Sequence, residues 1–264
     1  MELRGRTALV TGATGGLGAA ISRALAGRGA SLIVTGRRAD VLEPLAAETG
    51  ARAIAADLAD ADSVSRLLDD AGDVDVLVAN AGLPGSGHLT TFSEQDIDRA
   101  LAVNLRAPMV IARRLAEPMA ARGSGHIVFV SSLSGKVASG GGSVYAATKF
   151  GLRGFAHGLR EDLRDAGVGV SVVLPGFIRD SGMFHDANVE LPRFVGTKTP
   201  EDVAAGVLRA IERDRAEVDV APLSMRAGAA FAGLAPELSA RVQRRLGGAK
   251  VAEDMARGQA GKRA

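Results

Sequence analysis

Short apolar runs rich in Val, Ile and Leu alternate with longer stretches of helical periodicity, and this alternation limits the possible folds most strongly. Such runs are typical of strands buried on both faces, and strand–helix alternation gives a parallel sheet between two helical layers. Right-handed crossovers make that sheet doubly wound. Seven strands are expected at Thr7–Thr11, Ser31–Gly36, Arg52–Ala56, Val74–Ala79, His126–Ser131, Gly169–Leu174 and Val218–Ala221. Helices are expected at Gly16–Arg28, Ala39–Thr49, Ala61–Ala71, Glu94–Ala121, Val144–Ala166 and Pro200–Asp214.

The composition agrees with one α/β domain. Hydrophobic residues make up 47% of the 264 residues but aromatic residues only 3%, so Ala, Val, Leu and Gly must build the core. No repeat or linker divides the chain, and the long irregular segment 176–198 is embedded between predicted elements. We therefore predict a single domain over residues 1–238, followed by a basic segment, 239–264. The absence of cysteine excludes disulfides and thiolate catalysis.

The basic segment carries seven Lys or Arg residues against Glu253 and Asp254. Basic tails can bind nucleic acid or anionic lipid, but more often they are solvated, frayed ends. No aromatic residue interleaves the charges, so no nucleic-acid partner is predicted. The start Met1–Arg6 has no apolar secretory run, and the weakly polar stretch Ala227–Pro236 is too short to cross a bilayer. We expect a cytoplasmic protein with no integral membrane segment.

A glycine-rich turn follows the first predicted strand. Glycines between a strand and a helix permit a tight turn and let a pyrophosphate approach the backbone, while the helix start supplies free N–H groups. The alternative is that these glycines only close a turn. The pattern favours a dinucleotide site with contacts from Thr11, Gly12, Thr14, Gly15, Gly16, Leu17 and Gly18.

Two arginines, Arg37 and Arg38, follow the second predicted strand. An acidic residue near this position would bind the ribose 2′-hydroxyl of NAD, whereas guanidinium groups suit a 2′-phosphate by charge and geometry. We therefore expect NADP(H) rather than NAD(H), although Arg38 could simply begin the next helix. Asp57 and Leu58 follow the third strand and are expected near the adenine, with a helix cap as the alternative for Asp57.

The only tyrosine, Tyr145, precedes Lys149 by four residues in a predicted helix, so the two side chains share a face. A nearby cation can lower the pKa of a phenol from ~10 by roughly 1–3 units, towards the range where it exchanges protons at neutral pH. The alternative is a packed tyrosine beside a solvated lysine.

Together these motifs resemble the classical short-chain dehydrogenase/reductase family over about residues 5–222. Thr11–Gly18 is similar to the family's TGxxxGxG turn, and Ala79-Asn80-Ala81-Gly82 to its NNAG motif. Asn104 lies in the expected long helix, Ser132 precedes Tyr145 by thirteen residues, and Pro175-Gly176 closes the sixth strand. The resemblance implies a Rossmann-type fold and hydride transfer between NADP(H) and a carbonyl compound or secondary alcohol.

The resemblance also implies a role for each matching residue. Tyr145 would be the acid or base, and Lys149 would lower its pKa and bind the nicotinamide ribose. Ser132 would polarise the substrate carbonyl, and Asn104 would hold a water of a proton relay. Further cofactor contacts would come from Asn80, Ala81, Gly82, Pro175, Gly176 and Ile178. The family often has a Thr after this last stretch; here Arg179-Asp180-Ser181 stands in its place, and Ser181 is a candidate substitute.

Segment 176–198 would form a lid over the substrate. The apolar residues of this segment favour an apolar or lipid-like carbonyl compound as the substrate. The alternative is that they only pack against the rest of the domain. These residues are Phe177, Met183, Phe184, Leu191, Phe194 and Val195.

The four histidines are scattered, so no metal site is predicted. In relatives the two long helices form a dimer interface, which implies a homodimer or homotetramer. The alternatives are a non-catalytic dinucleotide-binding regulator, which would usually lack the Tyr or Lys, and a lyase or epimerase of the same fold.

Overall fold

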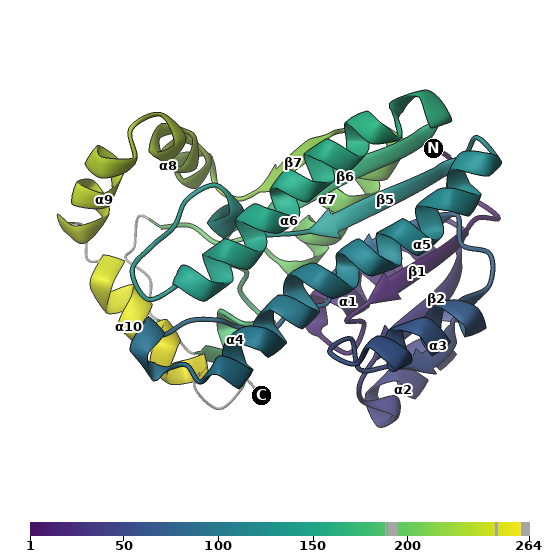
Figure 1. Ribbon diagram of the computed structural model, residues 1–264, viewed down its shortest axis with the longest axis horizontal. Coiled ribbons are helices and arrows are strands. Elements are labelled where there is room, and N and C mark those ends of the chain that lie inside the picture. The colour runs from purple at the N-terminus through teal and green to yellow at the C-terminus, as the bar shows by residue number, and fades with distance from the viewer. Residues whose placement is uncertain (188, 190–194, 246–247, 260–264) are drawn as a thin grey trace.

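A seven-stranded parallel sheet forms the centre of the molecule in the computed structural model (Figure 1), which describes residues 1–187, 189, 195–245 and 248–259. The strand order is β3-β2-β1-β4-β5-β6-β7, which confirms the predicted doubly wound fold. The order reverses between β1 and β4, and ligands bind at the carboxyl ends of strands at such a point. The strands are β1 (Thr7–Thr11), β2 (Ser31–Gly36), β3 (Arg52–Ala55), β4 (Val76–Ala79), β5 (Gly125–Val130), β6 (Val168–Pro175) and β7 (Glu217–Val220).

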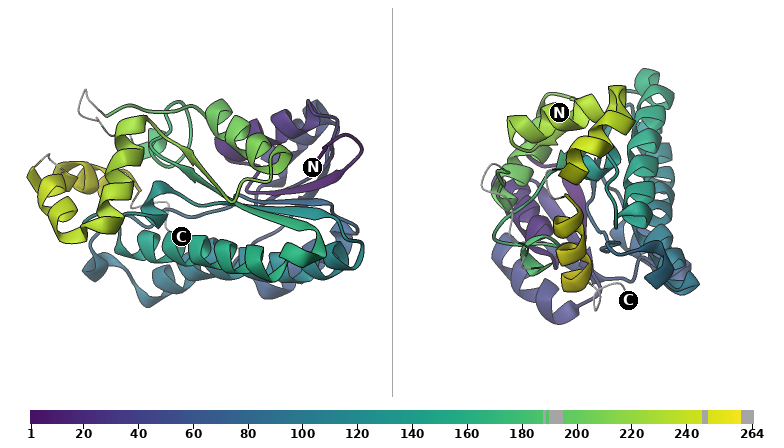
Figure 2. Two further views of the ribbon diagram at one scale, coloured as in Figure 1. Left: turned by 90° about the horizontal axis from the view of Figure 1, so that it is seen from above. Right: turned by 90° about the vertical axis from the view of Figure 1, so that its left-hand side faces the viewer.

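Helices cover both faces of the sheet (Figure 2). On one face Leu67, Ile111 and Leu152 pack in one buried cluster with β4, β5 and β6, and on the other Ile21 and Val207 pack against the same strands. The helices before β7 are α1 (Gly16–Ala26), α2 (Ala39–Thr49), α3 (Ala61–Ala71), α4 (Glu94–Leu101), α5 (Ala107–Ala121), α6 (Ser143–Asp162) and α7 (Pro200–Glu212). Shorter turns are η1 (Leu89–Thr91), η3 (Leu133–Gly135), η4 (Arg164–Ala166) and η5 (His185–Ala187).

The predicted helix Glu94–Ala121 is not uniform. A π-helical segment, η2 (Ala102–Arg106), separates α4 from α5, and Asn104 lies within it. A π-helical turn inserts an extra residue into the α-helical ladder and often marks a functional site. Its presence therefore gives Asn104 a position that a regular helix would not provide.

Among the described residues after β7, three helices were not predicted: α8 (Leu223–Leu234), α9 (Pro236–Arg245) and α10 (Gly248–Gln259). They lie beyond the carboxyl end of the sheet, and α10 runs back towards α4 (Figure 1). The interpretation of the basic segment as a solvated, frayed end is wrong for α10, because Gln259 is buried and α10 packs beside η5. Within the described part of the chain, no helix combines the length and the apolar character needed to cross a membrane.

Candidate functional site

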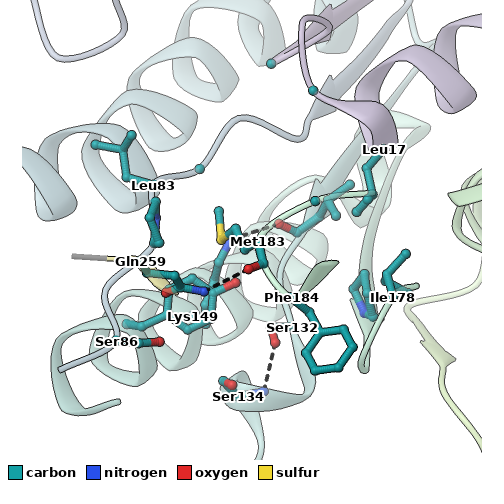
Figure 3. A pocket seen from close by; sticks show the side chains of 18 of the residues that line it. Leu17, Leu83, Ser86, Ser132, Ser134, Lys149, Ile178, Met183, Phe184 and Gln259 are labelled. Carbon is teal, nitrogen blue, oxygen red and sulfur yellow. Dashed lines mark hydrogen bonds between the residues drawn. The ribbon is translucent and has the colours of Figure 1, made fainter. Parts of the chain in front are cut away.

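One large cavity opens at the carboxyl ends of the strands. Its volume is about 790 Å³, within the range of roughly 300–1,000 Å³ that ligand pockets usually have. The glycine turn and Arg37 line one part of it, and Ser132, Tyr145 and Lys149 line another. Figure 3 shows side chains of its wall from α1, from segment 176–198 and from α10.

Thr11 and Asn80 join the carboxyl ends of β1 and β4 under the cavity. The Thr11 hydroxyl accepts hydrogen bonds from the backbone N–H groups of Asn80 and Ala81, both at 3.1 Å. The Asn80 amide donates in return to the backbone carbonyls of Thr11 at 3.0 Å and Gly12 at 3.3 Å. Thr11 lies behind the wall, where it fixes the turn, whereas Asn80, Ala81 and Gly82 line the cavity.

The glycine turn brings backbone to the cavity where side chains would not fit. Gly12 has φ of 68°, and a Cβ there would lie 2.7 Å from the Cα of Ala81. A Cβ on Gly18 would lie 2.3 Å from the carbonyl oxygen of Gly12. The first turn of α1 contains no acidic residue, so its free N–H groups and partial positive charge are available to an anion. The turn fits a diphosphate, and Thr14, Gly15, Gly16 and Leu17 line the same region.

Arg37 and Arg38 are exposed at the rim beyond this turn. Arg38 reaches the Thr14 carbonyl at 3.4 Å, and Leu58 lines the wall nearby. Asp57 accepts hydrogen bonds from the Ala59 N–H at 2.9 Å and from Arg99 at 3.2 Å. Burial raises the Asp57 pKa, but these two hydrogen bonds together with the charges of Arg99 and Arg37 outweigh burial and hold that pKa below its usual value. The rim therefore has two guanidinium groups and, nearby, an ionised carboxylate.

Ser132, Tyr145 and Lys149 come together on the opposite wall. A side-chain hydrogen bond joins Ser132 to Tyr145, and the Ser132 hydroxyl also accepts from the N–H of Ser134 at 3.1 Å. The Lys149 Nζ lies 5.5 Å from the centroid of the Tyr145 ring and donates to the Val130 carbonyl at 3.2 Å. The three residues come from the end of β5 and from successive turns of α6, as their spacing predicts.

The prediction of a lowered Tyr145 pKa is wrong for this structure. Burial raises the pKa of the phenol to about 12, and the hydrogen bond with Ser132 offsets only part of this effect. Burial also lowers the pKa of Lys149 to about 8. Desolvation therefore dominates both pKa values, and at neutral pH the phenol is protonated while Lys149 still carries its charge.

Asn104 lies behind this wall and is buried. Its side-chain oxygen Oδ1 accepts a hydrogen bond from the Leu83 N–H at 2.6 Å. Its side-chain nitrogen Nδ2 donates to the Leu83 backbone carbonyl at 2.9 Å and to the Thr148 hydroxyl at 3.4 Å. A Cβ on Gly82 would lie 3.6 Å from the Asn104 oxygen and 3.5 Å from the Lys149 Nζ. Asn104 and Lys149 thus flank the same glycine, while the water relay stays a prediction.

Pro175, Gly176 and Ile178, at the start of the predicted lid segment, line the cavity, while their contact with the cofactor stays a prediction. Ser181 lies against the start of α1, since a Cβ on Gly16 would be 1.6 Å from its hydroxyl oxygen. Asp180, which precedes it, has a left-handed backbone with φ of 70°. Phe177, Met183, Phe184 and Val195 line the cavity, whereas Leu191 and Phe194 lie outside the described residues.

Several residues of the wall were not predicted. Arg99, on α4, pairs with Asp57, and no motif pointed to it. The C-terminal helix contributes Val251, Met255 and Gln259. These three are spaced four residues apart and therefore share one face of α10, a periodicity that could have identified the helix.

A doubly wound sheet with a glycine turn and a Ser–Tyr–Lys group at its carboxyl edge is typical of oxidoreductases that use nicotinamide dinucleotides. The family model for short chain dehydrogenases matches residues 6–191, and the chain belongs to this family.

Two curated proteins and one solved structure illustrate the similarity. The ketoacyl reductase HetN of Nostoc sp. is 38% identical over 83% of this chain and 79% of its own length. The 1-deoxy-11-beta-hydroxypentalenate dehydrogenase of Streptomyces exfoliatus is 36% identical over 81% of this chain and 82% of its own. A short-chain dehydrogenase from Sphingobium yanoikuyae, solved in complex with NADPH, has a TM-score of 0.76 and 28% identity, with 89% of this chain and 95% of that chain covered.

Proposed function

We propose that this oxidoreductase uses NADP(H) to interconvert a ketone and a secondary alcohol on a largely apolar substrate. The observation that carries the proposal is that Ser132, Tyr145 and Lys149 share one cavity with the glycine turn and Arg37. The proposed proton donor and the proposed dinucleotide cradle would then line different parts of one site. When bound, the cofactor would supply the hydride from its nicotinamide ring.

Binding of the cofactor would use the residues of the first wall. Gly12 to Gly18 and the start of α1 would hold the diphosphate, and Asp57 and Leu58 would face the adenosine. Arg37 and Arg38 support a preference for NADP(H), because their exposed guanidinium groups can pair with a 2′-phosphate. The similar Sphingobium enzyme, solved with NADPH, adds support.

At neutral pH the second wall would supply the proton that reduction of a carbonyl requires. Negative charge grows on the carbonyl oxygen as the carbonyl is reduced, and the Ser132 hydroxyl would stabilise it. Because burial keeps the Tyr145 phenol protonated, Tyr145 would then give its proton to that oxygen. The charged Lys149 would stabilise the resulting phenolate, and Asn104 would connect Lys149 to solvent through a bound water.

The substrate end of the cavity supports an apolar compound. Phe177 and Phe184 lie with ring centroids 4.9 Å apart, and Met183, Val195 and Met255 line the cavity too. The two relatives are named for a ketoacyl group and for a hydroxypentalenate. A regulator that only bound the dinucleotide would need neither Tyr145 nor Lys149.

A panel of ketones that range from polar to apolar, assayed with NADPH and with NADH, tests the proposal. We expect NADPH oxidation with apolar ketones and a lower kcat/KM with NADH. NADPH binding without turnover of any ketone would instead support the regulator.

We further propose a homodimer across α4, α5 and α6, where Leu101, Met109 and Phe150 are exposed, and sedimentation velocity would measure the assembly.

A further inference from the structure

Gln259 is the last described residue of α10, and its side chain closes part of the substrate end of the cavity. It is only 2% exposed, although Gln is usually a surface residue. Met183 and Phe184 of the lid and Val251 and Met255 of the same helix line the cavity with it, so its polar group is set in apolar surroundings. Figure 3 shows Gln259 beside Met183 in the wall that also carries Lys149.

The orientation of the Gln259 amide follows from its neighbour. Its nitrogen donates to the backbone carbonyl of Met183 at 3.1 Å. A carbonyl oxygen accepts hydrogen bonds and cannot donate them, so the NH₂ end must face Met183. The same nitrogen lies 4.0 Å from the Met255 sulfur. Both contacts therefore use the nitrogen, and they fix the direction of the carbonyl end.

The carbonyl oxygen of Gln259, Oε1, is buried and has no hydrogen-bond partner among the described residues. Leaving a buried acceptor unpaired costs free energy, so such groups usually have a partner. Packing of α10 does not depend on this oxygen. A Cβ on Gly258 would lie 2.5 Å from the Ala187 Cα, and one on Gly141 would lie 3.4 Å from the Ala252 Cβ, which shows that α10 packs closely on both η5 and the loop that contains Gly141.

We propose that Gln259 is a specificity-determining residue whose carbonyl oxygen accepts a hydrogen bond from the substrate. The substrate class is then an apolar ketone, or its alcohol, that carries a second donor away from the reacting carbon, such as a hydroxyl or an amide N–H. This inference rests on the proposed function, because it assigns the substrate end of the same cavity. It makes the C-terminal helix part of the binding site.

Matched ketones test the inference. The compounds are hydroxy ketones of increasing chain length, each compared with its deoxy analogue and its methyl ether, which lack the donor. The readout is kcat/KM with NADPH. For the hydroxy ketone of the best length we expect the wild-type enzyme to prefer the donor-bearing compound by about 10- to 100-fold, since a site with an unpaired polar group rejects the analogue that cannot pair with it.

Gln259→Met keeps the size of the side chain and removes the acceptor, so the preference should fall to about 1. In Gln259→Glu a protonated carboxyl can still donate to Met183 and accept from the substrate, so that variant should retain a preference at acidic pH and serves if the Met variant does not fold. Arg257→Gln, on the exposed face of α10, is the control and should leave the preference unchanged.

The outcomes separate this inference from the proposed function. If the wild-type enzyme reduces ketones with NADPH but shows no preference at any length, the role of Gln259 is rejected and the proposed function stands. Equal loss of activity on both members of a pair in Gln259→Met would also reject it, because that result indicates only a structural role. If the wild-type enzyme reduces no ketone, both proposals are rejected.

Discussion

Thr11 and Asn80 bind each other in both directions: the Thr11 hydroxyl accepts from the Asn80 N–H at 3.1 Å, and the Asn80 amide donates to the Thr11 carbonyl at 3.0 Å. The pair joins two strands that are far apart in the sequence, at the point where the strand order reverses. It therefore sets the spacing of the turn that would hold the cofactor.

Thr11→Val should destabilise the protein. The substitution keeps the shape of the side chain but leaves the N–H groups of Asn80 and Ala81 without their acceptor, at a cost of about 1–3 kcal/mol. Urea unfolding measures the loss. Thr11→Ser, which retains the hydroxyl, is the matched control and should lose much less; equal losses for the two variants would mean that the hydroxyl is unimportant.

Arg37→Asp should shift the cofactor preference towards NADH. The change removes a guanidinium that would pair with the 2′-phosphate and adds a carboxylate that repels it, so kcat/KM for NADPH relative to NADH should fall by about 10- to 100-fold. Arg66→Asp makes the same charge change on the exposed face of α3 and should leave the ratio unaltered. An unchanged ratio of kcat/KM for NADPH to that for NADH in Arg37→Asp would show that Arg37 does not bind the 2′-phosphate.

Local sequence determined much of this fold. The bounds of β1, β2, α2 and α3 agree with the predictions because clear turn residues flank each element. The shared face of Tyr145 and Lys149 was predictable from local geometry, since the two residues lie four apart in a helix. The family resemblance, rather than local geometry, added Ser132 to this pair.

Glu217 should stabilise the fold at neutral pH and lose that effect in acid. Burial raises its pKa, but hydrogen bonds from Arg153, Lys136 and His157 outweigh burial and lower the pKa to about 2 from the usual 4.5. A lowered folded-state pKa means that the stabilisation is complete above pH 4.5 and disappears as the pH falls towards 2.

Glu217→Gln tests this expectation. At pH 7 the variant should lose about 1–3 kcal/mol of unfolding free energy, and its stability should converge with that of the wild type in acid. Glu48→Gln is the control: Glu48 pairs with Arg23 on the surface, so little change is expected. A constant difference between Glu217→Gln and the wild type from pH 7 to pH 3 would contradict the assignment.

Lys149→Met should stabilise the protein while it abolishes activity. Burial lowers the Lys149 pKa to about 8 from 10.5. The charged ammonium therefore destabilises the folded state at pH 7 by up to about 3 kcal/mol. The thermal midpoint of the variant should exceed that of the wild type at pH 7, and the gap should close as the pH rises through 10.5. A lower midpoint at pH 7 would mean that Lys149 is a net stabilising group.

Tertiary packing explains what the sequence did not predict. Nothing near Arg99 in the sequence points to Asp57, since the two lie 42 residues apart and meet only in the folded molecule, where the Arg99 side chain on α4 reaches Asp57. The spacing of Tyr145 and Lys149 could not predict the Tyr145 pKa, because the cost of burying a phenol depends on the walls around it. The charge pattern of residues 239–264 does not indicate the apolar face that Val251 and Met255 form on α10.

The most direct test of the account is kcat/KM for reduction of the best ketone by Tyr145→Phe, measured together with NADPH affinity by fluorescence titration. The substitution removes the proposed proton donor and preserves the ring. We predict that kcat/KM falls by about 10²- to 10⁴-fold while the dissociation constant of NADPH stays within about threefold of the wild-type value. Activity close to that of the wild type would contradict the role of Tyr145 as the proton donor.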